Sequence, residues 1–81
     1  MINKNFNKII SDRITALREN NGLNIEQLAY RSGISKGGLS EIERGLKEPR
    51  SYTIIRICAG LGISISDFYD FEEIKNFQNS L

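Results

Sequence analysis

Glycine and proline interrupt this 81-residue chain so often that only short regular elements can form between them. The interruptions fall at Gly22, Gly33, Gly45, Pro49 and Gly62. Between them, apolar residues recur at spacings of three and four, which is the period of one helical face. No segment alternates apolar and polar residues for long enough to predict a strand. The pattern therefore predicts an all-α chain of short amphipathic helices.

Capping residues refine the expected helix boundaries. Asn24 is a typical N-cap, and Gln27 three residues later gives a variant of the capping box. Ser35 and Ser64 are further N-cap candidates. The expected helices span residues 7–20, 25–31, 36–44 and 51–60, and a fifth opens at Ser64 and runs through Phe71.

The composition excludes several classes of protein. Hydrophobic residues make up 40% and charged residues 26%, as in an ordinary globular protein, and the length predicts a single domain over residues 1–81 with a core at 7–70. Histidine is absent and Cys58 is the sole cysteine, so we expect no disulfide, metal site or cofactor. The same absences argue against an enzyme. No apolar run approaches a membrane span and no signal-peptide pattern is present, which predicts a cytoplasmic protein.

The turn Ser32-Gly33-Ile34 joins the segments 25–31 and 36–44 in a manner typical of a helix-turn-helix. Two helices that cross steeply need a small residue at their closest approach, and Ala29 meets this need. Gly33 can adopt the positive φ that the turn requires. Apolar residues on both helices would pack the unit on the rest of the domain: Ile25, Leu28, Ile34, Leu39 and Ile42.

With these features the sequence resembles the lambda-repressor-like helix-turn-helix family, which includes Cro, phage repressors and XRE-type regulators. The resemblance covers about residues 9–70 and needs no insertion. It rests on Ile14-Thr15-Ala16-Leu17-Arg18, Asn21-Gly22-Leu23, Gln27-Leu28-Ala29, Gly33-Ile34-Ser35, Leu39-Ser40-Glu41-Ile42-Glu43-Arg44-Gly45, Pro49 and Ile57-Cys58-Ala59-Gly60-Leu61-Gly62-Ile63. It implies a five-helix domain that binds operator DNA through the helix at 36–44, usually as a dimer.

The second helix of a helix-turn-helix lies in the major groove of DNA. If Leu39 and Ile42 face the core, the 100° step between helical residues turns six other positions outward. These candidate base-contacting residues are Ser35, Lys36, Gly37, Ser40, Glu41 and Arg44. Lys36 can donate to guanine and Glu41 can accept from cytosine, with a merely solvated carboxylate as the alternative at Glu41.

Gly37 and Gly38 are unusual in the first turn of such a helix, because an interior glycine costs about 1 kcal/mol relative to alanine. They also remove side chains from positions where the family usually places base-reading residues. Two interpretations stay open at this point. Either the missing Cβ atoms allow close approach to DNA, or the protein reads sequence weakly and relies on phosphates and DNA shape.

Candidate phosphate contacts flank the helix-turn-helix at Asn24, Arg31, Lys47 and Arg50. Asn24 opens a helix whose N-terminus favours anions, and the other three are basic residues on loops and helix ends. The charge distribution supports a polyanionic partner, since residues 1–66 carry a net +4 and residues 67–81 a net −3. Ile25 stands where family members often carry a polar residue, so one usual phosphate contact is missing.

The resemblance also assigns one charged pair to the fold rather than to DNA. Arg18 and Glu43 match family residues that form a partly buried salt bridge between the first and third helices. Loss of either partner would leave a buried charge without its counter-ion.

Apolar residues continue towards the end of the chain at Ile65, Phe68, Tyr69, Phe71, Ile74 and Phe77. A monomer of this size has little capacity to bury them all, so the segment 65–81 is the candidate homodimer interface. The alternative is that Phe68 and Phe71 complete the core. A two-fold dimer would place its recognition helices about 34 Å apart on one face of the DNA.

The sequence thus predicts a dimeric DNA-binding transcriptional regulator, a repressor or autoregulator, whose partner is a palindromic double-stranded operator. The alternative is a protein–protein interaction module on the same scaffold, such as an antitoxin or anti-regulator. Such a module would bind a protein partner through the C-terminal segment, and the side chains missing at Gly37 and Gly38 favour it.

Overall fold

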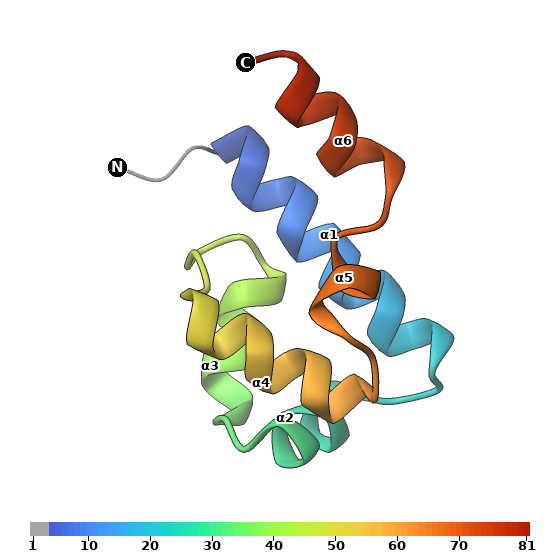
Figure 1. Cartoon of the computed structure of the whole chain (residues 1–81). Helices are drawn as coiled ribbons and strands as arrows, with labels where there is room; N and C mark the ends of the chain where they lie inside the picture. Colours follow the sequence, from blue (N-terminus) through green and yellow to red (C-terminus); the bar gives the residue numbers. More distant parts are fainter. Residues whose placement is uncertain (1–3) are drawn as a thin grey trace.

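The computed structural model describes residues 4–81, and within them it shows six helices and no strand (Figure 1). The helices are α1 (Lys4–Asn20), α2 (Ile25–Ser32), α3 (Lys36–Glu43), α4 (Ser51–Leu61), α5 (Ile65–Phe68) and α6 (Glu72–Asn79). The prediction of an all-α fold is confirmed, and the first four helices lie close to their expected bounds. α1 starts three residues before the expected 7, and α3 ends one residue before the expected 44.

The expected fifth helix ends at Phe68 rather than Phe71, and a sixth helix, α6, follows it, so the count of five is wrong for residues 4–81. At the C-terminal end of α5, Arg13 of α1 donates to two backbone carbonyl groups. Arg13 Nε donates to the Phe68 carbonyl at 2.9 Å, and Nη2 donates to the Asp67 carbonyl at 2.8 Å. The chain then becomes extended at Phe71, with φ −148° and ψ 154°, before α6 begins.

Local capping accounts for the start of the helices around the turn. The Asn24 side chain accepts from the Gln27 amide at 2.7 Å, and the Gln27 side chain accepts from the Asn24 amide at 2.8 Å. Ser35 caps α3 by accepting from the Gly38 amide, and Ser64 caps α5 by accepting from the Asp67 amide. The predicted capping box and both serine N-caps are therefore confirmed.

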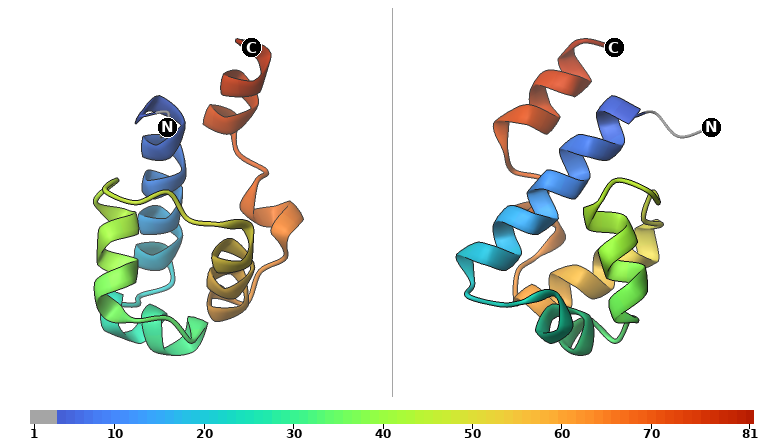
Figure 2. Two further views of the ribbon diagram at one scale, coloured as in Figure 1. Left: turned by 90° about the vertical axis from the view of Figure 1, so that its left-hand side faces the viewer. Right: turned by 180° about the vertical axis from the view of Figure 1, so that it is seen from behind.

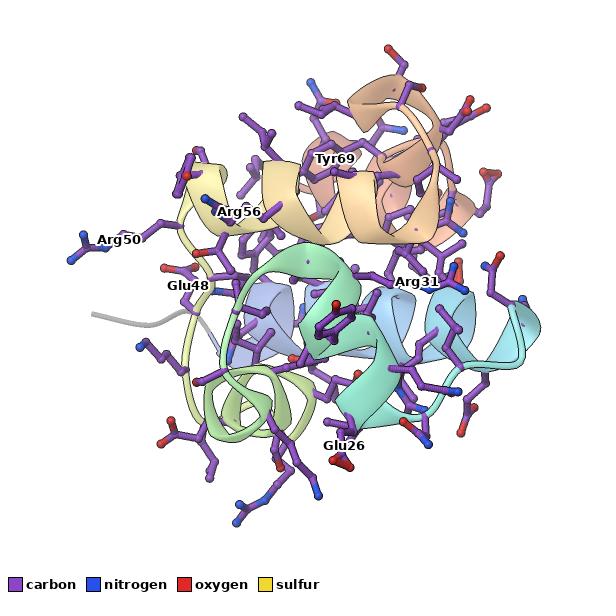
Figure 3. The ribbon with its side chains drawn as sticks, turned by 90° about the horizontal axis from the view of Figure 1, so that it is seen from below. Glu26, Arg31, Glu48, Arg50, Arg56 and Tyr69 are labelled. Atoms are coloured by element: carbon purple, nitrogen blue, oxygen red, sulfur yellow. The ribbon has the colours of Figure 1, made fainter. Side chains whose placement is uncertain are left out.

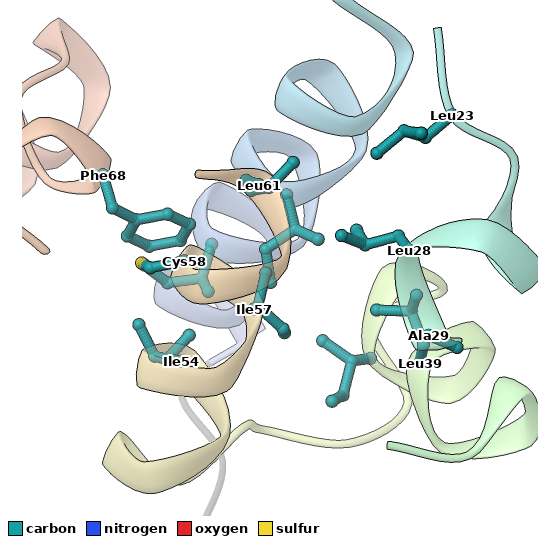
Figure 4. Close-up of a cluster of buried hydrophobic side chains, with 12 residues drawn as sticks. Leu23, Leu28, Ala29, Leu39, Ile54, Ile57, Cys58, Leu61 and Phe68 are labelled. Carbon is teal, nitrogen blue, oxygen red and sulfur yellow. The ribbon is translucent and has the colours of Figure 1, made fainter. Parts of the chain in front are cut away.

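The core lies between α1, α2, α3 and α4, and α5 closes it at one end (Figure 4). Phe68 is fully buried and its ring lies beside Cys58. Burial raises the pKa of the Cys58 thiol above its ordinary value. Phe68 therefore completes the core, and its prediction as a dimer-interface residue is wrong. The buried apolar residues are Ile10, Ile14, Leu23, Leu28, Ala29, Leu39, Ile42, Ile54, Ile57, Cys58, Leu61 and Phe68.

α6 lies along the N-terminal half of α1, outside this core (Figures 1 and 2). Its contact with α1 includes Phe77, whose ring centroid lies 5.4 Å from that of Phe6. Just before α6, the Phe71 ring lies 4.6 Å beneath the Arg13 guanidinium. None of the helices in residues 4–81 is both long and apolar enough to cross a membrane.

Candidate nucleic-acid interface

The two faces of α3 differ sharply in exposure. Leu39 and Ile42 are buried against the other helices. Five of the six candidate base-contacting residues are exposed, and the sixth, Ser40, is half-buried. The exposed five are Ser35, Lys36, Gly37, Glu41 and Arg44. The structure thus gathers all six on or beside one accessible helix surface.

A buried ion pair holds the C-terminal end of α3 against α1. Arg18 Nε lies 2.8 Å from Glu43 Oε2, and Arg18 Nη2 donates to Oε1 at 3.0 Å. The two side chains are only 12% and 6% exposed, and Thr15 also donates to Oε1. The hydrogen bond to Glu43 raises the pKa of Arg18 further above its ordinary value, so the guanidinium stays charged. The salt bridge expected between these helices is confirmed.

Two further hydrogen bonds connect the same end of α3 to α1, and the sequence analysis did not foresee them. The buried Ser11 hydroxyl lies 2.8 Å from the Ile42 carbonyl, and Asn7 Nδ2 donates to the Gly45 carbonyl at 2.8 Å. The Ile42 carbonyl also accepts from the Gly45 amide, so the side chains from α1 add to the backbone hydrogen bonds at this end of α3. α3 is therefore fixed from behind by both apolar and polar contacts.

Two shallow grooves flank the N-terminal end of α3. One, of about 450 Å³, lies between α3, the loop that follows it and the start of α4, and it brings Ser35 together with Lys47 and Arg50. The other, of about 420 Å³, lies at the start of α2 and brings Asn24 together with Lys36. The two grooves thus bring polar and charged residues that are far apart in the sequence to the exposed end of α3.

The comparisons with known proteins bear on this arrangement. The helix-turn-helix family HTH_3 matches residues 14–68, which include α2 to α5 and the C-terminal part of α1. The chain belongs to this family. It is a family of DNA-binding transcriptional regulators rather than enzymes.

Several relatives of this helix-turn-helix protein are named as regulators. The HTH-type transcriptional regulator SutR of Escherichia coli (strain K12) is 32% identical over 65 residues, which cover 80% of this chain and 36% of SutR. The uncharacterized HTH-type transcriptional regulator y4dJ of Sinorhizobium fredii is 35% identical over 57 residues, covering 70% of this chain and 74% of y4dJ. This chain therefore spans about a third of SutR and most of y4dJ.

Solved structures of similar proteins share the fold closely. The wild-type restriction–modification controller protein C.Esp1396I superposes with a TM-score of 0.80 at 27% identity, covering 90% of this chain and 94% of that one. The clp gene regulator ClgR of Corynebacterium glutamicum gives a TM-score of 0.74 at 31% identity, covering 86% and 87%.

In this helix-turn-helix protein, the Arg31 side chain does not lie on the surface around α3. Arg31 extends from α2 on the side away from α3, whereas Arg50 projects outward beside Glu48 near the start of α4 (Figure 3). The backbone of Arg31 instead packs on Gly60 of α4, where a Cβ would lie 3.2 Å from the Arg31 carbonyl carbon. Of the four candidate phosphate contacts, Asn24, Lys47 and Arg50 remain beside the exposed end of α3.

Arg56 was not singled out from the sequence, yet it contacts the turn of the helix-turn-helix. Its Nη1 donates to the Ser32 carbonyl at 3.4 Å, and its guanidinium lies 4.9 Å from the centroid of the Tyr52 ring. A Cβ on Gly33 would lie 2.7 Å from the same Nη1. Arg56 therefore connects the turn to α4, and the turn itself requires a glycine at Gly33 because of its positive φ of 68°.

The apolar stripe of α4 and α5 is a set of four exposed side chains. Tyr52 and Ile55 on α4 are 62% and 47% exposed, and Ile65 and Tyr69, at the start of α5 and directly after it, also keep large exposed areas. Tyr69 lines a pocket beside the start of α4, together with Ser51 and Ile54. Exposed aromatic and aliphatic side chains grouped in this way are typical of a protein–protein contact.

Proposed function

We propose that this helix-turn-helix protein binds a palindromic double-stranded operator as a homodimer and represses or autoregulates transcription there. The observation that carries the proposal is the difference between the two sides of α3. Its back is fixed by Leu39, Ile42 and the buried Glu43 carboxylate, while its outer face is open to a ligand. A rigid helix with a free polar face suits insertion into the major groove.

The charges around α3 support a nucleic-acid partner. Lys36 lies at its N-terminal end, Arg44 follows its last residue, and Lys47 and Arg50 lie across the adjacent groove. Cations on either side of a recognition helix can contact the phosphates of both strands while base edges are read between them. Glu26, Glu41 and Glu48 are exposed nearby, so non-specific affinity is limited and the sequence of the DNA matters more.

The apolar stripe of α4 and α5 supports the dimer and replaces part of the interface expected from the sequence. Phe68 is buried, and Phe71, Ile74 and Phe77 are half-buried within the protomer. Ile65 and Tyr69 from the expected set remain exposed, as do Tyr52 and Ile55 of α4. We therefore place the centre of the interface on α4 and α5, with α6 at most at its edge.

A DNA-binding experiment tests the proposal directly. Operator sequences would first be selected from random duplex DNA by the wild-type chain. The double substitution Lys36→Ala and Arg44→Ala should weaken binding to the selected sequence by more than tenfold, and wild-type affinity should fall steeply as salt is raised. Lys75→Ala on α6, far from α3, is the matched control and should retain full affinity. Unchanged affinity in the double variant would remove α3 from the interface.

The same selection distinguishes the alternative function. A chain that enriches no duplex sequence, yet recovers one stoichiometric protein partner through Tyr52 and Ile55, would be an interaction module instead. Substitution of Ile55 by Glu then separates the two cases. It should convert a dimeric regulator into a monomer with weaker operator binding, whereas in a module it should abolish partner capture only.

A further inference from the structure

Gly37 occupies an exposed position in the first turn of α3, and nothing around it requires a glycine. Its φ is not positive, and within residues 4–81 no atom lies within 4 Å of the Cβ that another residue would place there. An alanine would fit without strain and would also favour the helix. The glycine therefore needs an explanation from outside the protomer.

Each of the other six glycines has a reason inside the described part of the chain. A Cβ on Gly60 would lie 2.3 Å from Ser32 Oγ, and one on Gly38 would lie 2.9 Å from Ser35 Oγ, the atom that caps α3. The remaining four have φ values that other residues rarely adopt: Gly22, Gly33, Gly45 and Gly62. Gly37 and Gly38 of α3 therefore need separate explanations, because Gly38 leaves room for the Ser35 cap and Gly37 does not.

Gly37 also begins the row of residues that α3 presents outward. Ser40, Glu41 and Arg44 follow it at spacings of three, four and seven, so the four positions share one helical face. Gly37 is the N-terminal member of this row, and the N-terminal residues of a recognition helix approach the base edges most closely. A missing side chain at this point removes a contact but also removes an obstruction.

Two backbone amides in the first turn of α3 are available to donate hydrogen bonds to a ligand. The Gly38 amide donates to Ser35 Oγ and the Leu39 amide donates to the Ser35 carbonyl, both at 3.0 Å. The amides of Lys36 and Gly37 have no acceptor among residues 4–81. With no Cβ beside them, these two N–H groups can come within hydrogen-bonding distance of a ligand.

We propose that Gly37 is a specificity-determining residue whose missing Cβ leaves room for one base edge in the major groove. The inference rests on the proposed DNA-binding function and deepens it. The occupant of this space is a base pair whose major-groove edge projects too far to be accommodated beside an alanine methyl group. Selectivity at that base pair then arises from steric fit, in addition to any side-chain hydrogen bonds made by Lys36 and Ser40.

The substitution Gly37→Ala tests the proposal, because it should raise the stability of the protein and lower its affinity for the operator. The melting temperature should rise by roughly 4 °C or more, since alanine favours the helix and clashes with nothing. Affinity for the operator selected by the wild-type chain should fall roughly tenfold, the scale of one mismatched base pair, while affinity for random DNA changes less than about twofold. Selection with the variant should change the preferred base at one position in each half-site.

A matched control separates stabilisation from recognition. Asn76→Ala raises helix propensity at an exposed position of α6, so it should stabilise the fold and leave operator affinity and base preference unchanged. If Gly37→Ala likewise leaves both unchanged, the inference is wrong. An equal loss on operator and random DNA also overturns it, because the close neighbour would then be the phosphate backbone. A wild-type chain that binds no duplex instead refutes the proposed function, and the inference with it.

Discussion

α3 and α6 are both eight residues long, yet they are stabilised in opposite ways. α3 reads KGGLSEIE and contains two glycines, so its intrinsic helix propensity is poor. α6 reads EEIKNFQN, with two acidic residues in its first turn that suit the helix dipole. α3 nevertheless has two buried residues and α6 has none. The helix with the weaker local preference is the one held by the core.

The contacts of the two helices explain why this division suits a binding protein. α3 receives a buried guanidinium from α1 at Glu43 and apolar packing at Leu39, both on its inner side. α6 is joined to the body by the half-buried Ile74 and Phe77, and its Lys75 forms an exposed ion pair with Asp70 just before the helix. Because tertiary contacts fix α3, its outer residues are free to serve recognition rather than helix stability.

The largest effect is expected from removal of the Glu43 carboxylate, which holds the inner side of α3. Glu43→Ala should lower the free energy of unfolding by about 3–5 kcal/mol, because it leaves Arg18 buried without a counter-ion. Denaturant titration measures the loss. Asp12→Ala, which removes the exposed Lys8–Asp12 pair on α1, is the control and should cost less than about 1 kcal/mol. Similar losses for the two variants would show that α3 does not depend on the buried pair.

The next largest effect is expected from loss of an apolar contact between α3 and the core. Leu39→Ala should destabilise the protein by about 2–5 kcal/mol, because the cavity would open at the centre of the core. The same substitution should weaken operator binding measured well below the melting temperature, since it loosens the support of the recognition helix. Full affinity in a folded Leu39→Ala variant would separate recognition from core packing.

α6 should respond more weakly to an equivalent truncation. Phe77→Ala removes a half-buried ring from the surface of α1, so we expect a loss of about 1–2 kcal/mol in unfolding experiments, below the range for a core Phe. Operator affinity should not change, because α6 lies away from α3. A loss as large as that of Leu39→Ala would mean that α6 is part of the cooperative core.

The smallest expected effect is the titration of the exposed ion pair between Asp70 and Lys75 of α6. Lys75 lowers the pKa of the Asp70 carboxyl, and Asp70 raises the pKa of Lys75, chiefly through their hydrogen bond. The Asp70 contribution is therefore present above the unfolded pKa of aspartate and is lost as pH falls through the folded pKa. The Lys75 contribution is present below the unfolded pKa of lysine and is lost as pH rises through its raised pKa.

NMR titration of the Asp70 carboxyl carbon measures this shift. Lys75→Ala should return the pKa of Asp70 towards its ordinary range. Because both side chains are exposed, the change in unfolding free energy should be smaller than that of Phe77→Ala. An unshifted Asp70 in the wild-type protein would show that the pair does not persist in solution.

The sequence predicted the features that depend on residues close to one another along the chain. The helices from α1 to α4, the Asn24 capping box and the buried faces of α2, α3 and α4 all follow from spacings of a few residues. The Arg18–Glu43 pair was expected only from the family resemblance, since the two residues are 25 positions apart. Local pattern and family resemblance together therefore gave the scaffold that carries α3.

Features that depend on distant residues were missed or misassigned. The end of α5 is hydrogen-bonded to Arg13, which is 55 positions from Phe68. Phe68 was assigned to an interface because its hydrophobicity does not tell whether the core or a partner covers it. Nothing in the sequence distinguishes Arg31 from Arg56. In the folded protein Arg31 extends away from α3, whereas Arg56 contacts the turn between α2 and α3.

The position of the C-terminal residue has a practical consequence. Leu81 is almost fully exposed, and it lies at the end of the molecule opposite α2 (Figures 1 and 2). A fluorophore, surface tether or effector polypeptide joined to Leu81 would leave the exposed face of α3 unobstructed. Fusions at this position therefore allow the proposed DNA binding to be measured or coupled to a new output without a change in α3.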